Sequence, residues 1–127
     1  MKLKNAGLET AMQQLTLETL AETVQEHATV IVDFWAPWCT TCARFSPIYS
    51  DVATQFDDVL FATVNTDEQQ DLAAIMGIRS LPTLVAFRHG KHVFAKSGVT
   101  TRRQLAQIVD QIRSLEPQQD ASGPDTQ

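Results

Sequence analysis

The segment 29–35, TVIVDFW, constrains the fold more than any other part of the chain. It is a continuous run of β-branched and aromatic residues, which favour strands. Such a run is typical of a strand that is buried on both faces, as in a parallel sheet, so helices must cover both faces of that sheet. We expect Asp33, the charged residue inside the run, to be buried with it.

The remaining apolar patterns supply the other elements of an α/β domain. Helical spacing predicts a first helix that Thr16 caps, and a long helix after Trp38 that Pro47 should kink. A last amphipathic helix carries apolar residues up to Leu115, with Thr100 as its cap. Strands are predicted over 59–64 and 83–87, a short helix over 70–76 and an antiparallel edge strand over 92–95. The whole pattern predicts a central mixed β-sheet flanked by helices on both faces.

The length of 127 residues suits a single domain that buries its own core. We take residues 1–7 as a short N-terminal extension and residues 8–115 as the domain. Residues 116–127 contain Pro, Gly, Ser and Gln but almost nothing apolar, so we expect them to form a flexible C-terminal tail.

Charge and hydropathy argue against two classes of partner. The net charge is -5 and the basic residues are scattered, so we expect no nucleic-acid binding. The chain has no apolar run of about 18 residues, so we expect no membrane span. The N-terminus lacks the apolar stretch of a secretory signal, which predicts a cytoplasmic protein in a reducing environment.

The two cysteines, Cys39 and Cys42, stand three positions apart. A disulfide between them would close a very small loop and add little stability, so their spacing favours a chemical role over a structural one. They follow the buried strand and open a helix, where unpaired amides and the helix dipole stabilise a thiolate at Cys39. Cys42 lies one turn deeper on the same face. The outer sulfur can therefore attack a substrate disulfide, and the inner sulfur can resolve the mixed disulfide.

Two segments of the chain resemble a known family. Residues 32–42, VDFWAPWCTTC, resemble the active-site segment of thioredoxin, and residues 77–83, GIRSLPT, resemble a second segment of that family. The resemblance covers about residues 8–115. It implies the thioredoxin fold and a thiol-disulfide oxidoreductase whose substrates are proteins with exposed disulfides. It also implies regeneration by an NADPH-dependent thioredoxin reductase, and we expect the protein to be a monomer.

The resemblance implies roles for four residues at the reaction centre. Cys39 would be the nucleophilic thiol and Cys42 the resolving thiol. Asp33 would be the buried carboxylate below Cys42, with its pKa raised by desolvation so that it accepts the proton of that thiol. Pro82 would be a cis-proline that faces the disulfide.

Other residues would bind the substrate or support the site. The resemblance implies that the backbone of Leu81 pairs with an extended substrate segment by β-augmentation. Trp38 and Gly98 would border the shallow apolar groove that receives this segment. Trp35 would pack beside the active-site loop, and Pro47 would be the helix kink.

The sequence departs from the family pattern between the cysteines. Thr40 and Thr41, which we place at the substrate-binding surface, stand where ordinary thioredoxin has glycine and proline. Their hydroxyls lie near Cys39 and influence the stability of the reduced thiolate, so we predict a less reducing protein than ordinary thioredoxin. Thr63 stands where many thioredoxins carry a lysine, which should make Asp33 harder to ionise.

Alternatives to a redox pair stay open at this point. His89 and His92, with the two cysteines, would make a formal zinc ligand set. These histidines flank a hairpin turn that we expect to lie away from the cysteines, so we predict no metal ion and no bound cofactor. A thioredoxin-like module that only binds other proteins and, less favoured, an iron-sulfur cluster held between two chains are the other interpretations.

Overall fold

The computed structural model describes residues 12–117 of the chain. Within this range the chain forms a five-stranded sheet, in the order β1-β3-β2-β4-β5, and four helices. The elements are β1 (Gln13–Gln14), α1 (Leu17–Glu26), β2 (Thr29–Trp35), α2 (Thr40–Ala53), β3 (Leu60–Asn65), α3 (Gln70–Ile75), β4 (Thr83–Arg88), β5 (Lys91–Ser97) and α4 (Arg102–Arg113). The predicted extension over 1–7 and most of the predicted tail lie outside the described residues.

The sheet is mixed, as the sequence predicts. Its central strand is β2, which runs parallel to β3 and antiparallel to β4. β1 adds to β3 in parallel, and β5 adds to β4 in antiparallel. β2 has the bounds predicted for the buried strand, and it is buried along nearly its whole length.

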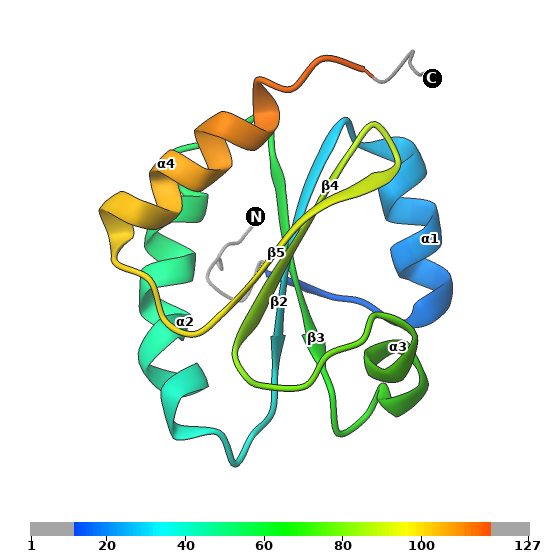
Figure 1. Cartoon of the computed structure of the whole chain (residues 1–127), viewed down its shortest axis with the longest axis vertical. Coiled ribbons are helices and arrows are strands. Elements are labelled where there is room, and N and C mark those ends of the chain that lie inside the picture. Colours follow the sequence, from blue (N-terminus) through cyan, green and yellow to red (C-terminus); the bar gives the residue numbers. More distant parts are fainter. Residues whose placement is uncertain (1–11, 118–127) are drawn as a thin grey trace, which may run out of the picture.

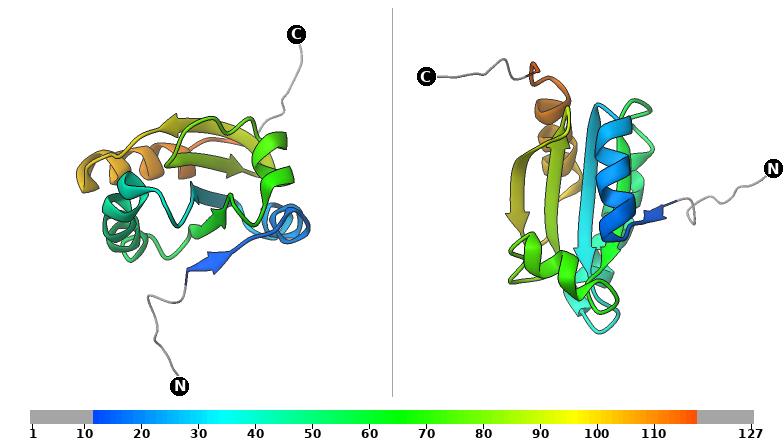
Figure 2. Two further views of the ribbon diagram at one scale, coloured as in Figure 1. Left: turned by 90° about the horizontal axis from the view of Figure 1, so that it is seen from below. Right: turned by 90° about the vertical axis from the view of Figure 1, so that its right-hand side faces the viewer.

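Helices cover both faces of the sheet (Figure 1). α2 and α4 pack on one face and α1 and α3 lie on the other, as two further views show (Figure 2). Alternate residues of β2 point to opposite faces of the sheet. Ile31 belongs to the same hydrophobic cluster as Phe45 from α2, whereas Val30 belongs to the same cluster as Leu20 from α1. Both faces of β2 are therefore apolar. Because Asp33 lies two residues after Ile31, its side chain points to the α2 side.

The start of α4 corrects one prediction, because its cap is Thr101 and not Thr100. The Thr101 hydroxyl accepts a hydrogen bond from the Gln104 backbone N–H at 3.1 Å, and the Gln104 side chain accepts one from the Thr101 N–H at 3.0 Å. A capping box needs a side chain three residues after the cap that can accept a hydrogen bond, and Thr100 has Arg103, which can only donate, at that position. Thr100 is buried instead.

Other predicted boundaries hold in part. Thr16 caps α1 as predicted, through a capping box with Thr19. Pro47 lies inside α2, while the kink that we expect there stays a prediction. α4 ends at Arg113, so Leu115 lies beyond the helix that was predicted to include it.

No helix in the range 12–117 has the length and the apolar character to cross a membrane.

Both edges of the sheet are short or irregular. β1 was not predicted, because Gln13–Gln14 is polar and exposed and gains its partner only by tertiary contact with β3. β5 pairs with β4 through a register shift between Ala86 and Phe87, and its side chains are mostly exposed.

The turn between β4 and β5 places the two histidines far from the cysteines. His89 and Gly90 both have positive φ, at 52° and 80°, as a type I′ hairpin turn requires. Arg88, just before this turn, pairs with Thr29 at the start of β2. The cysteines follow the other end of β2, so His89 and His92 lie at the opposite end of the sheet from them.

Candidate active site

The cysteine pair lies where β2 passes into α2. Cys39 is the N-cap of α2, with extended backbone angles, and Cys42 lies in the first helical turn. The two residues form a disulfide with a Cα–Cα distance of 5.2 Å, within the usual range for such bonds. Cys39 is 8% exposed and Cys42 is 4% exposed. The loop and the helix start thus present Cys39 at the surface side and keep Cys42 below it.

The sulfur of Cys39 is itself the capping group of the helix. Sγ accepts a hydrogen bond from the backbone N–H of Cys42 at 3.1 Å. After reduction, the same N–H and the positive end of the α2 dipole stabilise a thiolate at Cys39. Cys39 Sγ therefore lies at the point of the helix that best supports a negative charge.

The two threonines between the cysteines have different environments. The Thr41 hydroxyl lies 3.3 Å from Cys39 Sγ and donates a hydrogen bond to the Leu81 carbonyl, also at 3.3 Å. Thr40 is exposed. Thr41 is thus the member of the pair that links the disulfide to the loop before β4.

That loop contains the cis peptide bond predicted at Pro82, between Leu81 and Pro82. The backbone N–H of Gly98 donates to the Pro82 carbonyl at 2.9 Å. Gly98 has a φ of 94°, which a residue with a side chain rarely adopts, so glycine is required here. Gly98 thereby holds the backbone that faces the active-site loop.

A surface groove runs beside the disulfide. It has a volume of about 420 Å³ and is lined by Trp38, Cys39, Thr40, Thr41, Thr66, Ala73, Ile78, Arg79, Ser80 and Leu81. Trp38 is 69% exposed, and its indole N–H donates to Asp67 Oδ1 at 3.0 Å. The groove brings Trp38 and Leu81 together, as expected; Gly98 is not among the described residues that line it.

Trp35 packs beside the active-site loop. It lies against the small cluster of Ala36 and the two cysteines. Its carbonyl accepts hydrogen bonds from the backbone N–H of Thr66 at 2.8 Å and from the Thr66 hydroxyl at 3.0 Å. Thr66, which was not among the predicted site residues, therefore holds the end of β2 in place.

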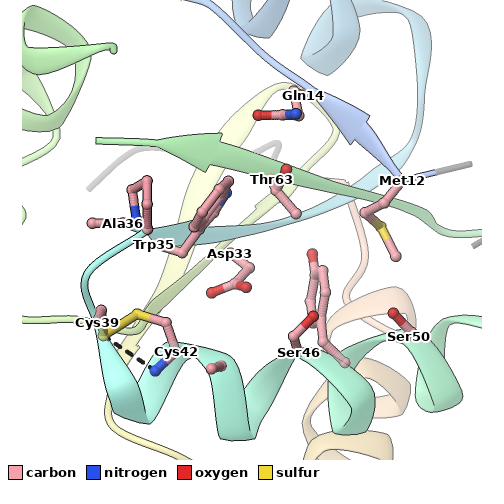
Figure 3. A pocket seen from close by; sticks show the side chains of 13 residues that line it. Met12, Gln14, Asp33, Trp35, Ala36, Cys39, Cys42, Ser46, Ser50 and Thr63 are labelled. Atoms are coloured by element: carbon pink, nitrogen blue, oxygen red, sulfur yellow. Dashed lines mark hydrogen bonds between the residues drawn. A yellow bond between two sulfur atoms is a disulfide. The ribbon is translucent and has the colours of Figure 1, made fainter. Parts of the chain in front are cut away.

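Asp33 lies beside the disulfide, in the cavity that both line (Figure 3). The cavity has a volume of about 510 Å³ and is bordered by β1, β2, β3 and α2. Asp33 is 4% exposed, and Oδ1 has no hydrogen-bond partner within the part of the chain that the structure describes. Burial raises the pKa of Asp33 from 3.8 to about 7. Thr63, its partner in the register of β2 and β3, lines the same cavity without a charge.

Polar residues of α2 complete this cavity, and sequence reasoning missed them. Ser46 and Ser50 line it, one and two helical turns after Cys42. Tyr49 lines it too, and its hydroxyl lies 2.9 Å from the Ile31 carbonyl and 2.8 Å from the Ala62 carbonyl. Burial raises the pKa of Tyr49. The four-residue spacing from Cys42 was the signal that places the serines on the same helix face.

The described residues contain no ready-made metal site. Among residues 12–117, no group of three or more His, Cys, Asp or Glu side chains is placed to hold a metal ion.

Comparisons with known proteins agree on one family. A family model described as Thioredoxin matches residues 11–111. The chain is 40% identical over 90 residues to thioredoxin 1 of Synechococcus elongatus, covering 70% of this chain and 84% of that protein. It is 38% identical over 96 residues to the thioredoxin of Mycoplasma pneumoniae, covering 76% of this chain and 94% of that protein. A solved mutant thioredoxin from Halobacterium salinarum aligns with a TM-score of 0.77 and 28% identity, over 89% of this chain and 100% of that one.

The matches extend over most of the described residues. The mixed five-stranded sheet with four helices is the thioredoxin fold. Thioredoxins are disulfide oxidoreductases, and the disulfide between Cys39 and Cys42 fits this activity. On its fold, its disulfide and these matches, the chain belongs to the thioredoxin family.

Proposed function

We propose that Cys39 and Cys42 exchange a dithiol for a disulfide with other proteins. In the reduced protein, the Cys39 thiolate attacks one sulfur of a substrate disulfide, and one substrate thiolate leaves. Cys42 passes its proton to Asp33, attacks the sulfur of Cys39 and expels the second substrate thiolate. Two electrons reach the substrate, and the protein ends with the disulfide that the structure contains.

One observation carries this proposal: the disulfide lies between a helix start and a buried carboxylate. The helix start supports negative charge on Cys39. The carboxylate of Asp33 has a pKa raised to about 7 by burial, so it can accept and release a proton near neutral pH. Both features serve thiol-disulfide exchange, and a module that only binds other proteins needs neither of them.

We propose that the clients are proteins with exposed disulfides that dock in the groove beside Cys39. Trp38 offers a large exposed apolar surface there, and Leu81 offers its backbone to an extended segment. Thioredoxins are reduced by thioredoxin reductase, and we propose an NADPH-dependent reductase of this kind as the electron donor.

Reduction of insulin disulfides tests the proposal. With dithiothreitol as the electron source, the parent protein should accelerate insulin reduction, and the Cys39→Ser protein should not. Repeating the assay with NADPH and a thioredoxin reductase tests the donor, because activity with dithiothreitol alone points to another reductase. A parent protein that behaves like Cys39→Ser would contradict the proposed exchange and favour a binding module.

We propose further that the protein is less reducing than ordinary thioredoxin, because the Thr41 hydroxyl lies 3.3 Å from the sulfur that becomes a thiolate. A hydrogen bond to a charged group contributes roughly 1.5–3 kcal/mol, and 30 mV corresponds to about 1.4 kcal/mol for this two-electron couple. Replacing the pair by Thr40→Gly and Thr41→Pro should therefore lower the potential by about 30 mV or more. Equilibration with glutathione buffers measures it; an unchanged potential, or a parent value at or below about -270 mV, would contradict this prediction.

The Asp33→Asn protein should resolve mixed disulfides more slowly, by about tenfold or more. Asparagine has the shape of aspartate but cannot take the proton of Cys42. In the parent, the rate at which the mixed disulfide is resolved should rise as pH passes through about 7, where Asp33 ionises. The Asp33→Asn protein should lack this rise. Rapid acid quenching of the mixed disulfide with insulin gives the rate. Unchanged kinetics would remove Asp33 from the mechanism.

A further inference from the structure

The carbonyl groups of Ser80, Leu81 and Pro82 are held in different ways. The Ser80 carbonyl accepts from the Thr83 hydroxyl at 2.5 Å, and the Pro82 carbonyl accepts from the Gly98 backbone N–H at 2.9 Å. The Leu81 carbonyl accepts from the side chain of Thr41, which belongs to a different element, at a longer 3.3 Å. Of the three, Leu81 is therefore the carbonyl that an incoming backbone N–H can most readily take over.

The Thr41 hydroxyl has one proton and two acceptors within reach, Leu81 O and Cys39 Sγ. While the disulfide is formed, the sulfur is a weak acceptor and the carbonyl is the stronger one. After reduction, a thiolate at Cys39 is a charged acceptor, and hydrogen bonds to charged groups are the stronger kind. The preferred partner of the hydroxyl thus changes with the redox state of Cys39.

We propose that Thr41 is a positioning residue that makes the reduced protein bind an extended substrate backbone more tightly than the oxidised protein. When Cys39 is a thiolate, the hydroxyl turns to the sulfur and leaves the Leu81 carbonyl to a substrate N–H. When the disulfide forms, the hydroxyl returns to Leu81 and competes with the backbone of the product. Docking is therefore favoured before exchange and release is favoured after it. This inference rests on the proposed function, since it needs exchange at Cys39 and backbone pairing at Leu81.

The coupling is reciprocal. If the thiolate favours docking by a given factor, docking must favour the thiolate by the same factor. The neutral thiol of Cys39 is a weak acceptor, as the disulfide is, so it also leaves the Thr41 hydroxyl on Leu81. A docked peptide should therefore lower the pKa of the Cys39 thiol. Proline in place of Thr41 has no hydroxyl and cannot supply this coupling.

A peptide that docks without reacting provides the test. We would use an acetylated and amidated insulin segment that spans one disulfide cysteine, with serine in place of that cysteine. Its dissociation constant is measured by fluorescence anisotropy, with the full chain either reduced or oxidised. The reduced parent is expected to bind about tenfold more tightly than the oxidised parent, within the usual range of such couplings.

Three variants isolate the hydroxyl. Thr41→Val keeps the branched shape and removes the hydroxyl, so it should bind the peptide equally in both redox states. Thr41→Ser keeps the hydroxyl and should keep the preference for the reduced state. Thr54→Val is the matched control, because it removes an exposed threonine hydroxyl at the other end of α2, and Thr54 lines neither the groove nor the cavity.

Titration of Cys39 by thiolate absorbance gives a second measurement. With saturating peptide, the pKa of Cys39 should fall in the parent and in Thr41→Ser but not in Thr41→Val. The ionisable groups that share a cavity or groove with Cys39 are Asp33 from β2, Cys42 and Tyr49 from α2, and Arg79 from the loop before β4. All four are present in every variant, so a difference between variants reports the hydroxyl.

The outcomes separate this inference from the function on which it rests. The proposed role of Thr41 would be overturned if the parent bound the peptide equally in the reduced and oxidised states. It would also be overturned if Thr41→Val kept the preference for the reduced state. Insulin reduction is assayed on the same samples. A parent that reduces insulin but binds the peptide equally in both redox states rejects only the role of Thr41, whereas a parent that does not reduce insulin rejects the proposed exchange.

Discussion

The Cys42→Ser protein is expected to stop halfway through exchange and to accumulate as a mixed disulfide between Cys39 and its client. Cys39 keeps its place as the cap of α2, so its thiolate still forms and attacks. Serine cannot attack the mixed disulfide, so insulin turnover should fall by at least about 100-fold, as losses of a nucleophile commonly do. Non-reducing electrophoresis and mass spectrometry of the reduced variant mixed with insulin should show a covalent adduct that dithiothreitol removes.

The matched control for the adduct formed by Cys42→Ser is the Cys39→Ser protein. It keeps Cys42, whose side chain is 4% exposed and lies in the first turn of α2, and it should form little or no adduct. Equal adducts from the two single variants would show that the sulfurs are interchangeable. Adduct formation through Cys42 alone would reverse the roles that we assign.

The Asp33→Asn protein should be more stable than the parent at alkaline pH. The pKa of Asp33 is raised by burial from 3.8 to about 7, so the folded state holds this proton more tightly than the unfolded state. Below about pH 4 the carboxyl is largely protonated in both the folded and the unfolded state, so it does not lower the free energy of unfolding. Between about pH 4 and 7 the free energy of unfolding of the parent falls, and above about pH 7 this loss stays constant. The difference between the two pKa values corresponds to about 4 kcal/mol, by which Asp33→Asn should be more stable than the parent above about pH 8 but not near about pH 4.

Urea denaturation at the two pH values measures this gain. Asp57→Asn is the matched control, because it removes a carboxylate from an exposed turn and should not show the pH-dependent gain. A stability difference between Asp33→Asn and the parent that is the same at both pH values would contradict the assignment of a raised pKa to Asp33.

The elements that the sequence predicted are those whose apolar pattern is set by burial. β2 was predicted to the residue because both of its faces lie under helices, so nearly every position is buried. β1 was missed because two polar, exposed residues carry no pattern, and only their pairing with β3 makes them a strand. The cap of α4 was misplaced by one residue, since Thr100 and Thr101 are equally good by composition and only the spacing to Gln104 distinguishes them.

The candidate site was predictable where a motif is contiguous and hidden where it is not. The resemblance to thioredoxin implied that Asp33 is a carboxylate below Cys42, and Asp33, Cys39 and Cys42 line one cavity. The bond from Thr41 to Leu81 joins residues that are 40 positions apart, so it depends on the packing of α2 against the loop before β4. Tyr49 had the spacing of a core residue, and only the three-dimensional structure shows its hydroxyl next to two strand carbonyls.

The two sheet edges have a consequence for where another chain can attach. An exposed strand edge is a template for any extended segment, and short strands, lysines and irregular pairing reduce that hazard. β1 has only two residues to offer, while β5 carries Lys91 and Lys96 and meets β4 through a register shift. An unfolded or extended client therefore finds poor templates at both borders of the sheet. In our proposal the client pairs instead with the accessible backbone at Leu81, so the blunted borders would help to direct clients toward Cys39.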